Sequence, residues 1–236
     1  GIIGSSINES AEVRRLAVLM KDFFDKTDEN LTIELPVEAK NFYDKIMELL
    51  TNDVKGMDYW RASNDAKEEY REAVTFGIDG EEAVIDVKQA KAFMEAIITR
   101  MDEGLAKAYN QETGVYDTYF INEAAEYKVL EENGEQLLNV TGLPLVEVSK
   151  FHTRAIPPFL EGQVHMMRAN PAVSESLHEA VKKSGIYDEK LDMFKVNADI
   201  MDETKEMGRQ NVFPRGWLEN EAVFLHMEYK LSLIHI

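Results

Sequence analysis

The chain has no cysteine, which excludes disulfide bonds and thiolate ligands to a metal ion. It also lacks any apolar run close to the ~20 residues that a membrane-spanning helix requires. The glycine-rich loops that bind nucleotide phosphates are absent, as is the His-Glu-x-x-His spacing of zinc enzymes. We therefore expect a cytoplasmic protein with no membrane segment, no metal site and no nucleotide cofactor.

Basic residues are scarce relative to acidic ones. Lys and Arg number 26 against 44 Asp and Glu, so the formal net charge is −18 and the sequence pI is about 4.7. Such a charge repels the phosphates of nucleic acids and anionic membrane surfaces, so neutral ligands fit the chain better. We expect neither nucleic acid nor a membrane as a partner. With 44% hydrophobic residues among 236, the chain can still bury a core.

Four helices are predicted from apolar residues at the i, i+3, i+4, i+7 spacing that lines one helix face. They are segment 9–26, a segment from about Pro36, a segment from Asp86 to residue 105, and a segment that Pro171 opens and Gly185 closes. The buried stripe of the first helix is predicted to be Val13, Leu16, Ala17, Met20, Phe23 and Phe24. Asp86 and Gln89 have the spacing of a capping box. A fifth helix is expected to begin near Trp217.

Segment 112–148 has a different character, with turn signals such as Asn133-Gly134 between short aromatic or β-branched runs. We expect a long loop or a small hairpin inserted between helices. Segment 157–168 is typical of a rim loop that leads into a barrel helix, where substrate contacts are possible but packing is the default role. The chain is therefore predicted to be mainly α.

Segment 213–226 gathers the residue types that bind a sugar and an anion. Trp217 offers a flat apolar face for a pyranose, and Glu219 and Asn220 can hydrogen-bond to hydroxyl groups. Arg215 and His226 can hold phosphate oxygens. If a helix begins near Trp217, its free N–H groups lie beside Arg215 and favour an anion there. The same residues also fit a capped helix start with a packed tryptophan.

The order Glu-Asn-x-x-Val-Phe-x-His, from Glu219 to His226, resembles the Glu-Asn-Gly-Gly-x-aromatic-x-His segment of cellobiose phosphorylases and related glycoside phosphorylases. The resemblance implies a partial (α/α)6 toroid with a short β-containing insertion. It also implies cleavage of a β-glucoside or oligosaccharide with inversion, by inorganic phosphate as co-substrate, to a sugar 1-phosphate. The substrate-binding residues would be Trp217, Glu219, Asn220 and Glu221, and the phosphate-binding residues would be Arg215 and His226.

The chain departs from this pattern at Glu221-Ala222, where the family has two glycines. Glycine lets backbone approach a ligand closely. A carboxylate there repels phosphate unless it points away or pairs with Arg215. An inverting hydrolase of the same architecture is therefore an alternative, with Glu219 or Glu221 as the base that activates water.

The general acid is expected upstream, because the phosphorylases carry it in an Asp-Trp-Asn-Asp segment. The nearest counterpart is segment 57–65, with Asp65 as the first candidate and Asp58 as the second. The competing interpretation is that Ser63 or Asn64 caps a helix over 66–73, with Asp65 in its first turn for dipole reasons. A third class of function, a helical carbohydrate-binding or structural segment, needs no acid.

Residues 231–236 match, codon for codon, the translation of a transposon-end adapter used to prepare sequencing libraries. We expect these residues to be non-native, and no fold prediction is drawn from them. The chain begins with Gly1, with no secretory signal after it. We expect residues 1–230 to be a piece of the (α/α)6 catalytic barrel of a longer bacterial enzyme, whose remainder would pack against it.

Overall fold

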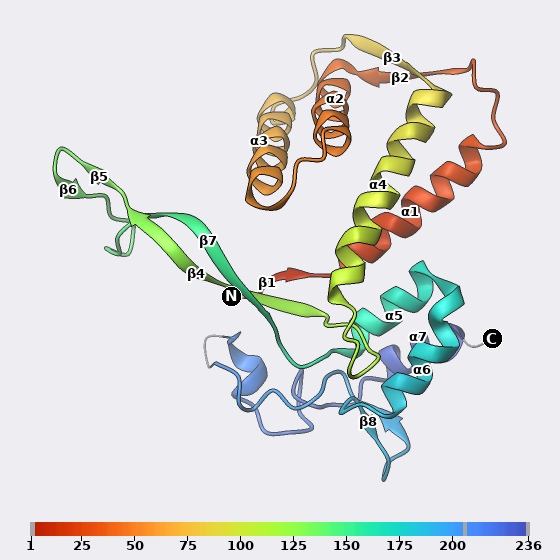
Figure 1. Cartoon of the computed structure of the whole chain (residues 1–236), viewed down its shortest axis with the longest axis vertical. Helices are drawn as coiled ribbons and strands as arrows, with labels where there is room; N and C mark the ends of the chain where they lie inside the picture. The colour runs from red at the N-terminus through yellow and green to blue at the C-terminus, as the bar shows by residue number, and fades with distance from the viewer. Residues whose placement is uncertain (1–2, 205–206, 235–236) are drawn as a thin grey trace. The chain divides into compact units, whose positions relative to one another are not determined.

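The computed structural model describes residues 3–204 and 207–234 and divides the chain into two compact units (Figure 1). The helical unit is Ser10–Ala106, and the mixed unit is Gly1–Glu9 with Lys107–Ile236. Each unit has its own hydrophobic cluster.

The fold is mixed α/β, with 47% helix, 22% strand and several antiparallel sheets. The prediction of a mainly α, partial (α/α)6 toroid is therefore wrong. Strands occur in both units, and the segment expected to hold a short insertion forms one arm of a long hairpin. Backbone pairing between distant segments, which has no local signal, is the reason for the error.

The helical unit has three of the predicted helices in their predicted places. Its elements are α1 (Asn8–Phe24), β2 (Thr32–Pro36), α2 (Val37–Thr51), α3 (Gly56–Val74), β3 (Glu82–Asp86) and α4 (Val87–Ala108). The capping box at the start of α4 is confirmed, because Gln89 N donates to Asp86 Oδ1 at 2.6 Å and Asp86 N donates to Gln89 Oε1 at 3.0 Å.

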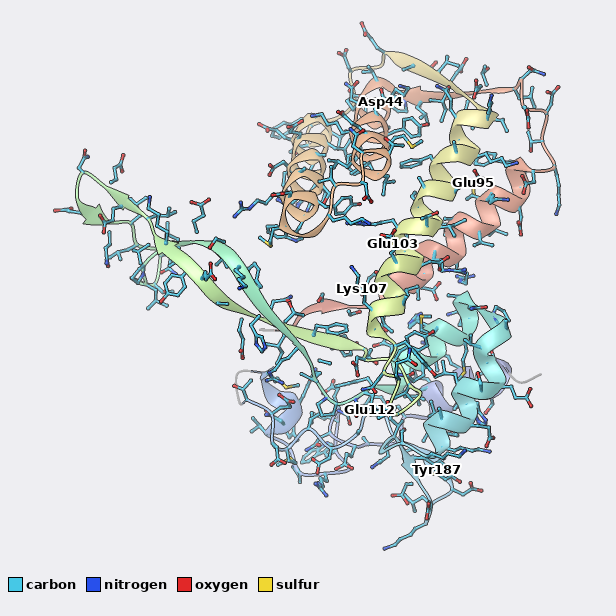
Figure 2. The ribbon with its side chains drawn as sticks, in the orientation of Figure 1. Asp44, Glu95, Glu103, Lys107, Glu112 and Tyr187 are labelled. Carbon is cyan, nitrogen blue, oxygen red and sulfur yellow. The ribbon has the colours of Figure 1, made fainter. Side chains whose placement is uncertain are left out.

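Strands β2 and β3 form an antiparallel ribbon that the sequence analysis missed. The ribbon and its neighbouring helices bury a cluster of Phe24, Ile85, Val87 and Ala90. Opposite charges link α1 to α4 through Arg14–Asp102 and Lys91–Asp25 ion pairs. Along α4, Glu103 pairs with Arg100 at 3.7 Å (Figure 2).

The predicted buried stripe of α1 is only partly correct. Ala17 and Phe24 are buried, but Leu16 is 57% exposed and Phe23 is 59% exposed. Met20 is partly buried against the Phe24 cluster. The helix therefore buries a narrower face than its apolar periodicity predicts, and Val13, Leu16 and Phe23 form exposed apolar surface.

The mixed unit contains a three-stranded antiparallel sheet in the order β1-β4-β7. These strands are β1 (Ile3–Ser6), β4 (Tyr119–Val129) and β7 (Val146–Ala155). Figure 1 shows β4 and β7 as a long twisted hairpin, with β5 (Glu131–Glu132) and β6 (Glu135–Gln136) at its tip. At the base of the hairpin, Tyr119 and Ile121 pair with β1 and place the sheet beside the unit's core.

The rest of the mixed unit consists of short helices and one two-stranded β-ribbon, joined by irregular segments. They are α5 (Leu160–Ala169), η1 (Pro171–Val173), α6 (Ser174–Lys182), β8 (Tyr187–Asp188), β9 (Met193–Phe194), η3 (Arg209–Asn211) and α7 (Leu225–Ile234). The core cluster is Ile121, Ile156, Phe159, Ile200 and Met207. The helical segment that Pro171 opens is confirmed as η1 followed by α6.

The last predicted helix begins at Leu225 and not near Trp217. Leu218 and Glu221 adopt φ angles of 50° and 53°, a left-handed conformation that a helix cannot contain. Residues 231–234 continue α7, and the side chain of Leu231 is buried. Residues 235–236 lie outside the described residues.

Candidate functional site

Residues 213–222 form a compact turn, which we call the tryptophan turn. Its backbone bonds run from Trp217 N to Pro214 O at 3.2 Å, from Asn220 N to Trp217 O at 3.2 Å and from Gly216 N to Asn220 O at 2.7 Å. Because these N–H groups bond within the turn, they are not a helix start. The anion site expected at such a start beside Arg215 is therefore not formed.

Two buried asparagines hold the tryptophan turn. Asn220 Nδ2 donates to Phe213 O at 2.7 Å, so its amide points into the turn. Asn197 Nδ2 donates to Glu219 O at 2.5 Å, and its Oδ1 accepts from Glu221 N at 2.6 Å. Asn197 and Asn220 are both 0% exposed. Both asparagines thus have a structural role, and the Asn197 carboxamide sets where Glu219 lies.

The strand-like segment around Asn197 also contacts the start of α5. Leu160 N donates to Val196 O at 2.9 Å, and Ala198 N donates to Pro158 O at 3.0 Å. The same three-residue segment therefore bonds to the tryptophan turn on one side and to α5 on the other. This arrangement brings residues about 60 positions apart into one site.

Glu221 pairs with two cations. Its Oε2 lies 3.0 Å from Arg215 Nε and its Oε1 lies 2.7 Å from Lys195 Nζ. Arg215 also pairs with Asp199. The pairing of Glu221 with Arg215, named above as one condition for tolerating this carboxylate, is present. The positive φ at Glu221 is a backbone conformation that favours glycine. Glycine, which the resembled pattern has at this position, would suit it.

A cavity of about 250 Å³ lies next to the tryptophan turn in the mixed unit. It is lined by Tyr119, Phe159, Glu161, Val196, Gln210, Glu219, Phe224, His226 and Met227. Two predicted site residues, Glu219 and His226, thus meet in one cavity. Polar groups that surround an apolar floor are the usual lining of a small-ligand site.

The other predicted residues of segment 213–226 lie outside this lining. Arg215, Asn220 and Glu221 make the contacts described above. Trp217 is 57% exposed, and its ring packs on Phe213 with centroids 5.4 Å apart. Its indole remains an accessible apolar face in the same turn as Glu219.

Glu161 in the cavity belongs to a chain of hydrogen bonds. Tyr119 Oη donates to Glu161 Oε2 at 2.5 Å, and Asn8 Nδ2 donates to Tyr119 Oη at 3.2 Å. His165 Nε2 lies 3.9 Å from Glu161 Oε1. Burial, followed by the hydrogen bond to Glu161 and its charge, raises the pKa of Tyr119 far above the ordinary value for a phenol. Tyr119 therefore stays protonated as a donor at neutral pH.

Gln210 presents a buried acceptor at the same cavity. Within the described parts of the chain, its Oε1 is shielded from solvent and accepts no hydrogen bond. A buried acceptor without a partner costs about 1–3 kcal/mol.

The two candidate acids from the sequence lie elsewhere. Asp58 and Asp65 are exposed residues of α3 in the helical unit. Since α3 begins at Gly56, Ser63 and Asn64 are interior helix residues, and the predicted cap before a helix at 66–73 is wrong. The cavity therefore does not draw on α3 and has carboxylates of its own.

Three polar residues of the cavity lining were not among the predicted site residues: Tyr119, Glu161 and Gln210. Glu161 has the position of an ordinary first-turn acid in α5, which the helix dipole alone explains. Tyr119 begins a strand, and Gln210 lies in a short 3-10 helix. Their only distinguishing signal is the tertiary contact itself.

A scan against models of known protein families gives no match for this chain, and a search of curated proteins gives none either. The resemblance to glycoside phosphorylases therefore rests on the residues quoted for it. Among the described residues, no helix combines the length and apolarity needed to cross a membrane. The same residues contain no group of three or more His, Asp or Glu side chains placed to hold a metal ion.

Proposed function

We propose that the mixed unit carries the sugar site of a carbohydrate-active enzyme that cleaves a β-glucoside by inverting phosphorolysis to a sugar 1-phosphate. The observation that carries the proposal is the convergence of Glu219 and His226 with Glu161 and Gln210 in one cavity. Carboxylates and a carboxamide suit sugar hydroxyl groups, and an imidazole suits a phosphate oxygen. The Glu-Asn…His resemblance supplies the reaction.

Hydrolysis is the second candidate, and a specific observation favours it. Arg215, the predicted phosphate ligand, already pairs with Asp199 and Glu221, so its charge is balanced. The cavity also contains two carboxylates, as an inverting hydrolase requires for its acid and its base. Glu221 forms ion pairs with Lys195 and Arg215. Of the two bases named from the sequence, Glu219 is therefore the better candidate.

Product analysis separates these reactions. The protein is incubated with a panel of β-glucosides, with and without inorganic phosphate, and the products are identified by mass spectrometry. Sugar 1-phosphate that forms only with phosphate supports phosphorolysis. Free glucose at a rate independent of phosphate supports hydrolysis. Sugar binding without turnover, lost in Trp217→Ala, would instead indicate a binding module.

Replacing Glu221 by glycine should strengthen phosphate binding. The change removes the carboxylate that Lys195 and Arg215 contact and relieves the positive φ at this position. One charge-assisted hydrogen bond contributes about 1.5–3 kcal/mol, so the Kd for phosphate should fall at least about tenfold by calorimetry.

The matched control for this prediction is Glu221→Gln, which removes the charge but keeps the side-chain length. A gain in both variants assigns the effect to charge, and a gain in the glycine variant alone assigns it to backbone relief. An unchanged Kd in both would show that Lys195 and Arg215 do not contact phosphate.

A further inference from the structure

We infer that Glu161 is the general acid of this cavity and that Tyr119 is its positioning residue. The inference rests on the proposed function, because it assigns a role within glycoside cleavage. It replaces Asp65 and Asp58 of the helical unit with a carboxyl group that lines the same cavity as Glu219 and His226. Glu161 reaches this cavity from the first turn of α5.

The hydrogen bonds fix which oxygen of Glu161 can carry the proton. Tyr119 has one hydroxyl hydrogen, and its oxygen accepts from Asn8 Nδ2. The hydroxyl hydrogen is therefore directed to Glu161 Oε2, which acts as an acceptor in either protonation state of the carboxyl group. The transferable proton belongs on Oε1.

Charged and titratable groups face Glu161 from several elements. Tyr119 lies on β4 and His165 on the same helix α5, and Glu219 and His226 belong to the lining of the same cavity. Glu9 of α1 interacts electrostatically with both Tyr119 and His165. The raised pKa of Tyr119 keeps this donor in place across the neutral range.

The chemical step balances with this assignment. Glu161 gives its proton to the glycosidic oxygen, and the bond between that oxygen and the anomeric carbon breaks with its electron pair left on the oxygen. A phosphate oxygen forms the new bond to the anomeric carbon, and the proton it releases restores Glu161. The products are the free alcohol and the sugar 1-phosphate. In hydrolysis, water takes the place of phosphate and Glu219 accepts its proton.

The test uses Glu161→Gln, which keeps the shape and the acceptor for Tyr119 but removes the acidic proton. Turnover of a β-glucoside with a poor alkyl leaving group should fall about 10²–10⁴-fold. An aryl glucoside with a good leaving group needs little protonation and should lose far less. Glu147→Gln, the same change at an exposed site on β7, is the control and should leave both rates unchanged.

Tyr119→Phe tests the positioning role. It removes the hydroxyl that holds Oε2, so kcat for the alkyl glucoside should fall roughly tenfold, the order of one lost hydrogen bond, with KM nearly unchanged. If Glu161→Gln loses turnover equally on the alkyl and aryl substrates, or loses none, the inference that Glu161 is the acid is overturned. The proposed function still stands in that case, provided that the wild-type protein cleaves these substrates. Absence of turnover in the wild-type protein on every glucoside would overturn both.

Discussion

Replacing Gly162 by alanine should destabilise the mixed unit by about 3 kcal/mol or more, the upper end of the usual cost of overpacking, even though alanine is the better helix former. A Cβ on Gly162 would meet Thr118, at 2.8 Å from Cγ2 and 3.0 Å from Cβ, with Oγ1 closer still. Thr118 is fully buried, and its hydroxyl donates to Phe159 O at 3.0 Å and accepts from Phe159 N at 3.2 Å. The threonine therefore cannot move away without breaking two buried hydrogen bonds.

Gly104→Ala is the matched control for this prediction. Gly104 lies inside α4, and an added Cβ there has no neighbour within 4 Å. This substitution should stabilise its unit by about 0.5–1 kcal/mol through helix propensity. Urea unfolding measures the two effects. Trp217 fluorescence is the probe for the mixed unit in a Trp60→Phe background, and Trp60 fluorescence is the probe for the helical unit in a Trp217→Phe background. A neutral Gly162→Ala would show that α5 can shift away from Thr118.

Local sequence signals predicted the helices that have strong local determinants. Asp86 and Gln89 specify the start of α4 because their side chains bond to each other's backbone N–H groups. Pro171 similarly marks the start of the 3-10 helix that leads into α6. Interactions within four residues of each other are enough to define these boundaries.

Non-local pairing explains the elements that were missed. In the helical unit, Ile33 pairs with Ile85 across 52 positions, and nothing in either short strand indicates its partner. The start of α7 was misplaced for a different reason. Leu218 and Glu221 have left-handed backbone conformations, which leucine and glutamate rarely adopt and do not signal. A glycine at either position would have marked the turn.

The candidate site also contains some residues with a local sequence signal and others without one. Glu219 and His226 were found because they lie seven residues apart in one segment with a family resemblance. Glu161 and Gln210 join them through the tertiary fold, so no local pattern distinguishes them from surface residues. The sequence located one wall of the cavity and missed the wall that holds the inferred acid.

Asn197→Ala should have the second large effect on stability, because its carboxamide holds the tryptophan turn to the segment whose backbone also bonds to the start of α5. The change leaves Glu219 O and Glu221 N without their partner in a buried place. At about 1–3 kcal/mol for each buried group left unsatisfied, the mixed unit should lose roughly 2–5 kcal/mol of unfolding free energy. Gln136→Ala, which removes an exposed carboxamide from β6, should cost less than about 0.5 kcal/mol.

Asn197→Asp distinguishes the contribution of the hydrogen bond to Glu219 O from that of the hydrogen bond from Glu221 N. Aspartate at this position can still accept the hydrogen bond from Glu221 N. It cannot donate to Glu219 O, and it places a carboxylate oxygen next to that carbonyl oxygen. The loss of unfolding free energy in Asn197→Asp should therefore exceed half of the loss in Asn197→Ala. This loss should increase as the pH rises and the new carboxyl group ionises. A loss below about 1 kcal/mol in both variants, in urea unfolding followed by Trp217 fluorescence, would contradict this account. The tryptophan turn would then be held mainly by the ion pairs of Glu221 with Lys195 and Arg215.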